Sequence, residues 1–100
     1  MPLTINSLGF VAVVTPGIRV QPFNWKLLCQ LVRLQPRRSK TVLNVGNVYI
    51  YGTQTGGQPF GILGPEQVNG MSVALYNFDL SSIWIDADNA NDAVLVGYNQ

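Results

Sequence analysis

Three aspartates lie within the stretch from Asp86 to Asp92, and closely spaced carboxylates can bind a metal ion or share a proton in catalysis. The stretch begins like an EF-hand loop, because Asp86 and Asp88 stand at the first and third ligand positions. The match then ends, since Ala90 stands at the fifth position and Gly97 stands where the bidentate glutamate belongs. We therefore interpret the stretch as a solvated loop between two strands, with a calcium site as the alternative.

The nucleophilic side chains lack a base that would activate them. The chain has no histidine, so neither Ser81 nor Ser82 can belong to a triad that uses one. The only cysteine, Cys29, stands in an apolar stretch, where a thiol behaves as a small hydrophobic side chain. It has no partner in the chain for a disulfide, and a Cys/His zinc site cannot form. The sequence thus predicts a protein that is not an enzyme and carries no cofactor.

The most concentrated positive charge lies in Arg37, Arg38 and Lys40. Such a cluster can contact phosphates or acidic protein surfaces. A nucleic-acid module would add a wider basic face, and the isoelectric point of about 7.9 falls short of the strongly basic range. Nucleic acid is therefore the less favoured partner, and two interpretations stay open for the cluster: a solvated turn and a contact with protein.

Opposite charge for this basic cluster is present in the same chain. All six basic residues lie between Arg19 and Lys40, and all five acidic residues lie between Glu66 and Asp92. The two groups can meet within one subunit or across a boundary between subunits, and both possibilities stay open. The interface candidates are Arg37, Arg38 and Lys40 on the basic side and Asp86, Asp88 and Asp92 on the acidic side.

A second candidate binding surface is aromatic. Tyr49 and Tyr51 are two residues apart, so both point to the same face if their segment is a strand. Together with Trp84 they can form an exposed platform that stacks on sugar rings. The alternative is that these aromatic side chains pack into the core.

Short apolar segments and regular breakers predict an all-β protein. Ten glycines and six prolines separate segments rich in Val, Ile, Leu, Tyr and Trp, which favour a pleated surface. Turns are predicted at Thr15–Gly17, at Thr55–Gln58 and at Asn69–Gly70. The expected strands are Leu3–Ile5, Phe10–Val14, Ile18–Gln21, Leu27–Gln35, Val48–Tyr51, Met71–Tyr76, Ser82–Ile85 and Ala93–Tyr98. Eight short strands favour a single antiparallel β-sandwich or a jelly-roll-like barrel.

The segment 25–34 also fits a helix, because its leucines follow a helical spacing. Pro22 and Pro36 bracket the segment, and no capping box precedes it. We therefore predict a strand there, buried on much of both faces.

The chain carries few charges for its length. One hundred residues make one small domain that can bury a single core. Only 11% of the residues are charged, against about 25% in an ordinary soluble domain, and nine Asn, seven Gln, five Thr and five Ser supply neutral polar groups instead. Neutral polar groups are cheaper to bury in a subunit contact than unpaired charges are. We expect an extended N-terminal arm over residues 1–8, available to a neighbour, and a sandwich domain over residues 9–100.

Neither a targeting signal nor a membrane span is expected. The first ten residues have no basic start and no long apolar stretch. The longest uninterrupted apolar run, Phe10–Val14, is far shorter than the roughly 20 residues of a membrane helix. We expect a chain that is made and kept inside a cell.

The order and spacing of six segments resemble those of a known family of proteins. They are Pro16–Gln21, Cys29–Gln35, Asn44–Ile50, Leu63–Glu66, Asp79–Ile85 and Asp92–Val96. Their order resembles that of small β-sandwich virion proteins of tailed bacteriophages. In such proteins a strand that ends near a glycine is followed by a glycine hairpin and then by a turn with Pro and Glu, which leads into the next strand.

The resemblance implies a capsid decoration (cement) protein or a head-fibre protein, not an enzyme and commonly a homotrimer. Its partners would be the phage major capsid protein or other virion proteins, and its place the virion, after synthesis in the host cytoplasm. Such a protein bridges neighbouring capsid subunits, so rupture of the shell must also break its buried contacts. Two alternatives stay open: a tail or baseplate module, and a carbohydrate-binding sandwich that uses the aromatic platform.

Overall fold

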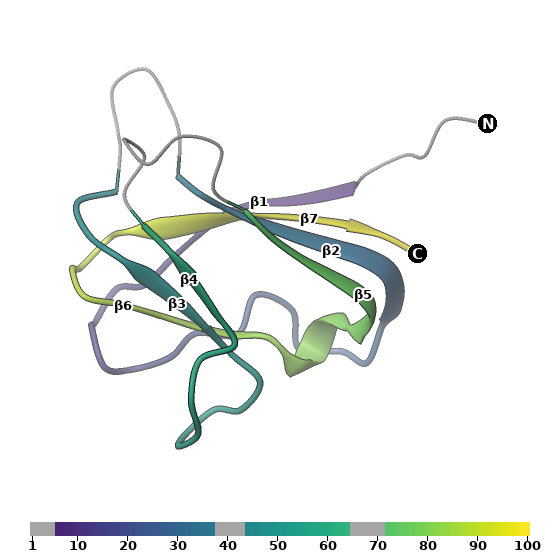
Figure 1. The fold of residues 1–100 in the computed structure, drawn as a ribbon, viewed down its shortest axis with the longest axis horizontal. Helices are drawn as coiled ribbons and strands as arrows, with labels where there is room; N and C mark the ends of the chain where they lie inside the picture. The colour runs from purple at the N-terminus through teal and green to yellow at the C-terminus, as the bar shows by residue number, and fades with distance from the viewer. Residues whose placement is uncertain (1–5, 38–43, 65–71) are drawn as a thin grey trace.

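The computed structural model describes residues 6–37, 44–64 and 72–100. In these ranges the chain forms two antiparallel β-sheets and one turn of 3₁₀ helix, η1 (Leu80–Ser82) (Figure 1). The strands are β1 (Asn6–Ala12), β2 (Leu28–Pro36), β3 (Val48–Tyr51), β4 (Gly61–Leu63), β5 (Val73–Asp79), β6 (Trp84–Ala87) and β7 (Ala93–Asn99). The prediction of a small all-β sandwich is confirmed. No helix in the described part of the chain has the length and hydropathy to cross a membrane.

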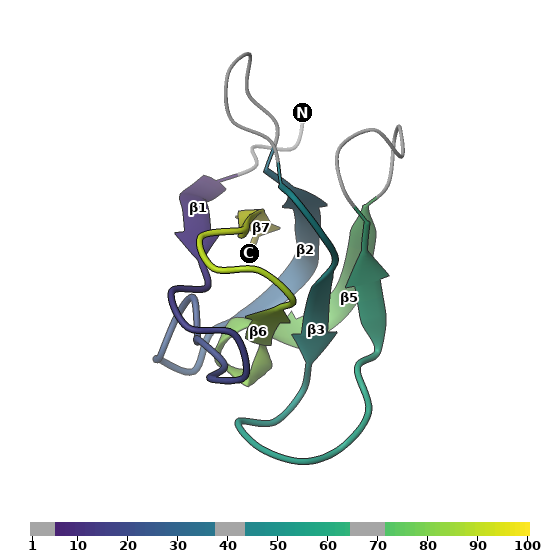
Figure 2. The ribbon, with the colours of Figure 1, turned by 90° about the vertical axis from the view of Figure 1, so that its left-hand side faces the viewer.

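The larger sheet has the strand order β1-β7-β2-β5, and the smaller sheet has the order β4-β3-β6. The start of β1 and the C-terminal end of β7 lie at the same end of the molecule (Figure 1), because Asn6 pairs with Tyr98. The opposite end carries the loop that follows β1 and the turn between β6 and β7, and Figure 2 looks onto it. The larger sheet is therefore built from both ends of the described chain.

The core lies between the two sheets and follows the two-residue period of the strands. Val32 and Leu34 of β2 and Val96 of β7 point inward from the larger sheet, and Ile50 and Ile85 point inward from the smaller sheet. All five are fully buried. Burial of each such side chain stabilises the fold by about 1.5–3 kcal/mol. The alternate residues of the same strands must then face outward.

A β-bulge in β1 changes which of its residues face outward. Ser7 pairs with Gly97, but Gly9 pairs with Val96, so one extra residue lies in β1 at this point. Gly9 has a φ of +73°, in the left-handed region that glycine adopts without a steric penalty. Because of the extra residue, Ser7 and Phe10 lie on the same outer face.

β2 and β5 share an irregularity that reverses their alternation. The pair Cys29–Phe78 and the pair Leu31–Tyr76 flank it, and the intervening Asn77 has a φ of +52°. Cys29 and Val32 are both buried although they are three residues apart, a spacing that places two residues of a regular strand on opposite faces. The reversal puts Leu28 on the same outer face as Tyr76, and these two residues are 67% and 71% exposed.

The two sheets approach each other along β4 and β5. A Cβ atom at Gly61 would lie 2.8 Å from Cγ2 of Val73, so a larger residue at position 61 would push the two strands apart. On the other side of the larger sheet, β1 has a hydrogen-bonded neighbour on one edge only, as far as the described residues show. Residues 6–8 of the expected N-terminal arm belong to this edge strand, and residues 1–5 lie outside the described ranges.

Two strand predictions need correction. The segment 18–21 contributes only an isolated bridge, in which Val20 and Ile85 exchange backbone hydrogen bonds of 2.9 and 2.8 Å. It is too short for a strand, because Gly17 and Pro22 end it on both sides. The strand β4 was not predicted, because its three residues begin with a glycine that has low strand propensity. It is a strand because β3 supplies its hydrogen-bonding partner.

The remaining elements agree with the prediction to within a few residues. Segment 25–34 forms no helix, and its residues from Leu28 onward belong to the strand β2, as predicted. β1 lies earlier than expected, and β5 and β6 run later, since Ser82 belongs to η1. The turn at Thr15–Gly17 is confirmed by a hydrogen bond from Ile18 N to Thr15 O, and the hairpin tip at Thr55–Gln58 joins β3 to β4. The expected strand Leu3–Ile5 and the expected turn Asn69–Gly70 lie outside the described residues.

Candidate functional site

Asp92, one of the acidic interface candidates, is buried and bonded within its own chain. Only 3% of Asp92 is exposed. Its carboxylate accepts hydrogen bonds from the backbone N–H groups of Val45 and Gly46, at 2.9 and 2.8 Å. Beside it, the buried Asn44 exchanges two hydrogen bonds of 2.8 Å with the backbone of Ala93. Asp92 and Asn44 therefore fasten the loop before β3 to the start of β7.

Asp86 and Asp88 also have partners in the chain, but they lie nearer the surface. Asp86 accepts hydrogen bonds from the N–H groups of Gly17 and Ala87, at 2.9 and 2.8 Å. Asp88 is exposed and accepts a hydrogen bond of 2.9 Å from the hydroxyl of Tyr49. That bond raises the pKa of the Tyr49 hydroxyl above its ordinary value, because it favours the protonated form. Within the described ranges, no three His, Cys, Asp or Glu side chains gather as metal ligands would.

Of the basic candidates, the structure places Arg37 only, because Arg38 and Lys40 lie outside the described residues. The Arg37 guanidinium lies 5.8 Å from the centre of the Phe10 ring, a cation–π distance. The backbone N–H of Arg37 donates a hydrogen bond to the carbonyl oxygen of Ala93. Between described residues, no ion pair joins Arg37 to Asp86, Asp88 or Asp92. The predicted contact across a subunit boundary stays a prediction for the two less buried aspartates.

The aromatic candidates come together on the outer face of the smaller sheet. Tyr49 and Tyr51 alternate with the buried Val48 and Ile50, and Tyr51 pairs across the strands with Trp84. All three aromatic side chains are half-buried. The guanidinium of Arg19 lies 3.3 Å from the centre of the Tyr51 ring and takes the place that a sugar ring would need there.

The outer face of the larger sheet is a further surface, which sequence reasoning missed. We define it by the side chains that point away from the core on β1, β7, β2 and β5: Ser7, Phe10, Leu28, Leu31, Arg33, Gln35, Ala74, Tyr76, Leu95 and Gly97. Phe10 is 49% exposed, Leu28 67% and Tyr76 71%. Single exposed apolar residues are ordinary, but several on one sheet face indicate a surface that another molecule covers.

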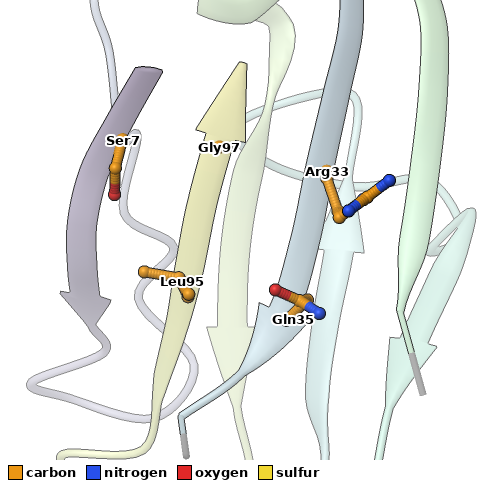
Figure 3. A pocket seen from close by; sticks show the side chains of 5 residues that line it. All are labelled: Ser7, Arg33, Gln35, Leu95 and Gly97. Carbon is orange, nitrogen blue, oxygen red and sulfur yellow. The ribbon is translucent and has the colours of Figure 1, made fainter. Parts of the chain in front are cut away.

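A hollow of about 180 Å³ lies within this outer face. Its lining residues come from three adjacent strands: Ser7 from β1, Leu95 and Gly97 from β7, and Arg33 and Gln35 from β2 (Figure 3). Gly97 leaves the space open, because it has no side chain between Ser7 and Arg33, its partners on the two neighbouring strands. A glycine inside a strand is a sequence signal for such a close approach, and Gly97 is one.

Arg33 is the one charged residue in this set, and the guanidinium of Arg37 lies beside the same face, 5.8 Å from the centre of the Phe10 ring. In the described part of the chain the guanidinium of Arg33 has no hydrogen-bond acceptor and no carboxylate partner, and it is exposed. The Ser7 hydroxyl accepts a hydrogen bond of 3.0 Å from Gly9 N and can still donate one to a ligand. The hollow thus combines a free cation, an amide and a hydroxyl within an apolar surround, an arrangement suited to binding.

The chain was compared with protein-family models, with curated proteins and with solved structures, and none of these comparisons finds a match.

Proposed function

We propose that this protein is a non-enzymatic structural protein of a bacteriophage virion, which binds the outside of the capsid and stabilises it by bridging capsid subunits. The observation that carries the proposal is the apolar outer face of the larger sheet. Phe10, Leu28 and Tyr76 are each about half exposed or more, on a domain with unusually few charges. Covering them with capsid protein would bury apolar area and leave few charges to be matched by the partner.

In this proposal the protein stabilises the capsid only by binding to it, without catalysing a reaction. Contacts of standard size bury about 800 Å² on each partner, and a β-sandwich presents a rigid surface that loses little entropy on docking. A ligand that binds only the assembled shell shifts the equilibrium away from rupture by mass action. A few kcal/mol for each copy, repeated over many sites, would raise the force or temperature at which the shell breaks.

Co-sedimentation tests the proposal directly. Purified protein is mixed with undecorated phage heads, and the bound fraction is measured against free concentration. We expect saturable binding, weakened by about tenfold or more in the double variant Phe10→Ser, Tyr76→Ser, because two exposed anchors of the outer face are lost. Ile18→Ser is the matched control, since Ile18 is 65% exposed but lies on the loop after β1. Failure of the unaltered protein to sediment with heads would contradict the proposal. Binding to purified tails or baseplates instead would favour the tail module.

We further propose that the protein assembles into a homotrimer, in keeping with the resemblance described above. β1 supports this proposal, because its open edge has no charged residue that would oppose pairing with another strand. Sedimentation equilibrium over a range of protein concentrations would show the trimer and its dissociation. A monomer at every concentration would exclude it.

The carbohydrate-binding alternative has one observation in its favour, the gathering of Tyr49, Tyr51 and Trp84 on one face of the smaller sheet. A glycan array with the folded protein tests it. If this function holds, Trp84→Ala abolishes a glycan signal without unfolding the protein, whereas the outer-face double variant keeps it. A flat array would exclude this function.

A further inference from the structure

Arg33 stands in the middle of the outer face with open space on both sides. Its cross-strand partners are Gly97 on β7 and Ala74 on β5, which have no side chain and a single methyl group. A longer residue at either position would cover the guanidinium. Arg33 lines the hollow, and Figure 3 shows its guanidinium directed away from Gly97, toward β5, where its five N–H donors stay exposed.

The acidic residues of the described chain are not available to Arg33. Asp79 accepts from Leu27 N and from Ser81. Asp86, Asp88 and Asp92 have the partners given above, which lie on loops and on the smaller sheet. An arginine on an apolar face costs free energy to cover unless its charge is matched. Among the described residues none supplies a counter-charge to Arg33, so a partner that covers the face would have to bring one.

The surroundings of Arg33 narrow the chemistry of that partner. Leu95 lies on one side of the hollow, and Leu31 and Tyr76 pair with each other on the other side of Arg33. Apolar side chains are the natural contacts for these three residues. Gln35 adds an amide that can donate a further hydrogen bond beside the guanidinium. A planar, two-oxygen anion fits a guanidinium through two parallel hydrogen bonds, and a carboxylate is the form in which proteins carry one.

We propose that the outer face binds an acidic side chain, Asp or Glu, of a partner protein, flanked in that partner by apolar residues, and that Arg33 holds its carboxylate beside the hollow with help from Gln35. This inference rests on the proposed function and names the feature of the capsid surface that this protein recognises. A different protein fits better than a second copy, because Asp86 and Asp88, the less buried described aspartates, have no exposed apolar neighbour in sequence: Ile85 and Ala87 are buried.

A peptide titration followed by NMR tests the recognition itself. The full-length ¹⁵N-labelled protein is titrated with acetyl-Leu-Glu-Leu-amide and, as the matched probe, with acetyl-Leu-Gln-Leu-amide. We expect the glutamate peptide to shift the amide signals of Arg33, Gln35 and Gly97, and to bind about tenfold more tightly than the glutamine peptide, since one charge-assisted bidentate contact distinguishes them. Equal affinity for the two peptides would overturn the inference.

Variants of Arg33 separate the bidentate contact from charge alone. Arg33 is exposed and has no partner among the described residues, so its replacement leaves the fold intact. We expect Arg33→Gln to remove the preference for the glutamate peptide and Arg33→Lys to restore part of it, because lysine keeps the charge but not the planar fork. Lys26→Gln, which removes one charge from an exposed loop, is the control and should keep the full preference. A preference that survives in Arg33→Gln would contradict the proposal, as would binding of inorganic phosphate to the hollow in place of the peptide.

Phage heads distinguish failure of this inference from failure of the proposed function. If both hold, the unaltered protein sediments with heads, and Arg33→Gln binds them about tenfold more weakly. Equal binding of the two proteins would overturn the carboxylate contact and leave the decoration function standing. Selective peptide binding without head binding would overturn the decoration function and keep the contact.

Discussion

The guanidinium of Arg19 lies 3.3 Å from the centre of the Tyr51 ring, and Nη1 of Arg19 donates hydrogen bonds to the carbonyl oxygens of Thr53 and Gly56 at 2.9 and 2.8 Å. One side chain thus connects the segment before β2 to the exposed loop between β3 and β4. Arg19 thus attaches the tip of this loop, while Phe60 attaches its end through a ring contact with Phe78.

Replacement of Arg19 should loosen this loop without unfolding the protein. We expect Arg19→Leu to lose about 1–2 kcal/mol of stability, from one cation–π contact and two hydrogen bonds. Hydrogen exchange at residues 53–58 should accelerate, while exchange in β2 and β7 stays slow. Lys26→Gln, which removes the same charge elsewhere, is the control. Unchanged exchange in the loop would show that Arg19 does not hold it.

Removal of the Asp92 carboxylate should be among the most damaging single changes. Asp92→Ala removes a buried carboxylate and leaves the part-buried N–H groups of Val45 and Gly46 without their acceptor, and we expect a loss of about 2–4 kcal/mol. Asp88→Asn, at an exposed position, should change stability by no more than about 0.5 kcal/mol. Urea unfolding measures both. Equal midpoints for the two variants would contradict this account.

Asp79 should contribute to the pH dependence of stability. Hydrogen bonds from Leu27 N and from Ser81 hold the pKa of this carboxyl below its ordinary value of 3.8. Since folding lowers the pKa of Asp79, its ionised carboxylate stabilises the fold at pH values above the ordinary pKa. This stabilisation is lost as the pH falls through the pKa of the folded protein. In Asp79→Asn the urea midpoint should therefore fall less than in the unaltered protein between pH 5 and pH 2, because the amide does not titrate. Parallel curves for the two proteins would refute the prediction.

The Cys29 thiol should be unreactive in the folded protein. Burial, and secondarily the charge of Asp79, raise the pKa of the Cys29 thiol above its ordinary value, and the side chain is only 1% exposed. The thiolate, which is the reactive form, is therefore scarce and hard to reach. At pH 8 we expect a thiol reagent to label the native protein at least about tenfold more slowly than the urea-unfolded protein. Rapid labelling of the native state would mean that the sheet opens at this position.

The N-terminal segment should be needed for assembly. Deletion of residues 2–7 removes Asn6 and Ser7 from the edge strand β1 and takes Ser7 from the hollow. We expect lower occupancy on phage heads and a change in oligomer size, with circular dichroism showing that the sheets persist. Unchanged occupancy together with unchanged oligomer size would refute the role of this segment.

The class of fold and most of the strands follow from the amino-acid sequence alone. Glycine and proline end segments locally, and β-branched and aromatic residues favour strands wherever they lie, so β2, β3 and β7 could be predicted closely. Gly61–Leu63 could not, because three residues become a strand only when β3 pairs with them. The burial of Asp92 was likewise hidden, since its partners Val45 and Gly46 come from a loop far away in the sequence.

Only the tertiary structure decided which residues form the candidate binding surface. The bulge at Gly9 puts Ser7 on the same face as Phe10, and the irregularity at Asn77 puts Leu28 on the same face as Tyr76. Neither reversal can be read from a two-residue period. Arg33 and Gly97 are 64 positions apart in the chain, yet they pair directly because β2 and β7 are neighbours in the sheet. A sheet face is assembled from strands distant in sequence, so its chemistry depends on register, and register is set by long-range pairing.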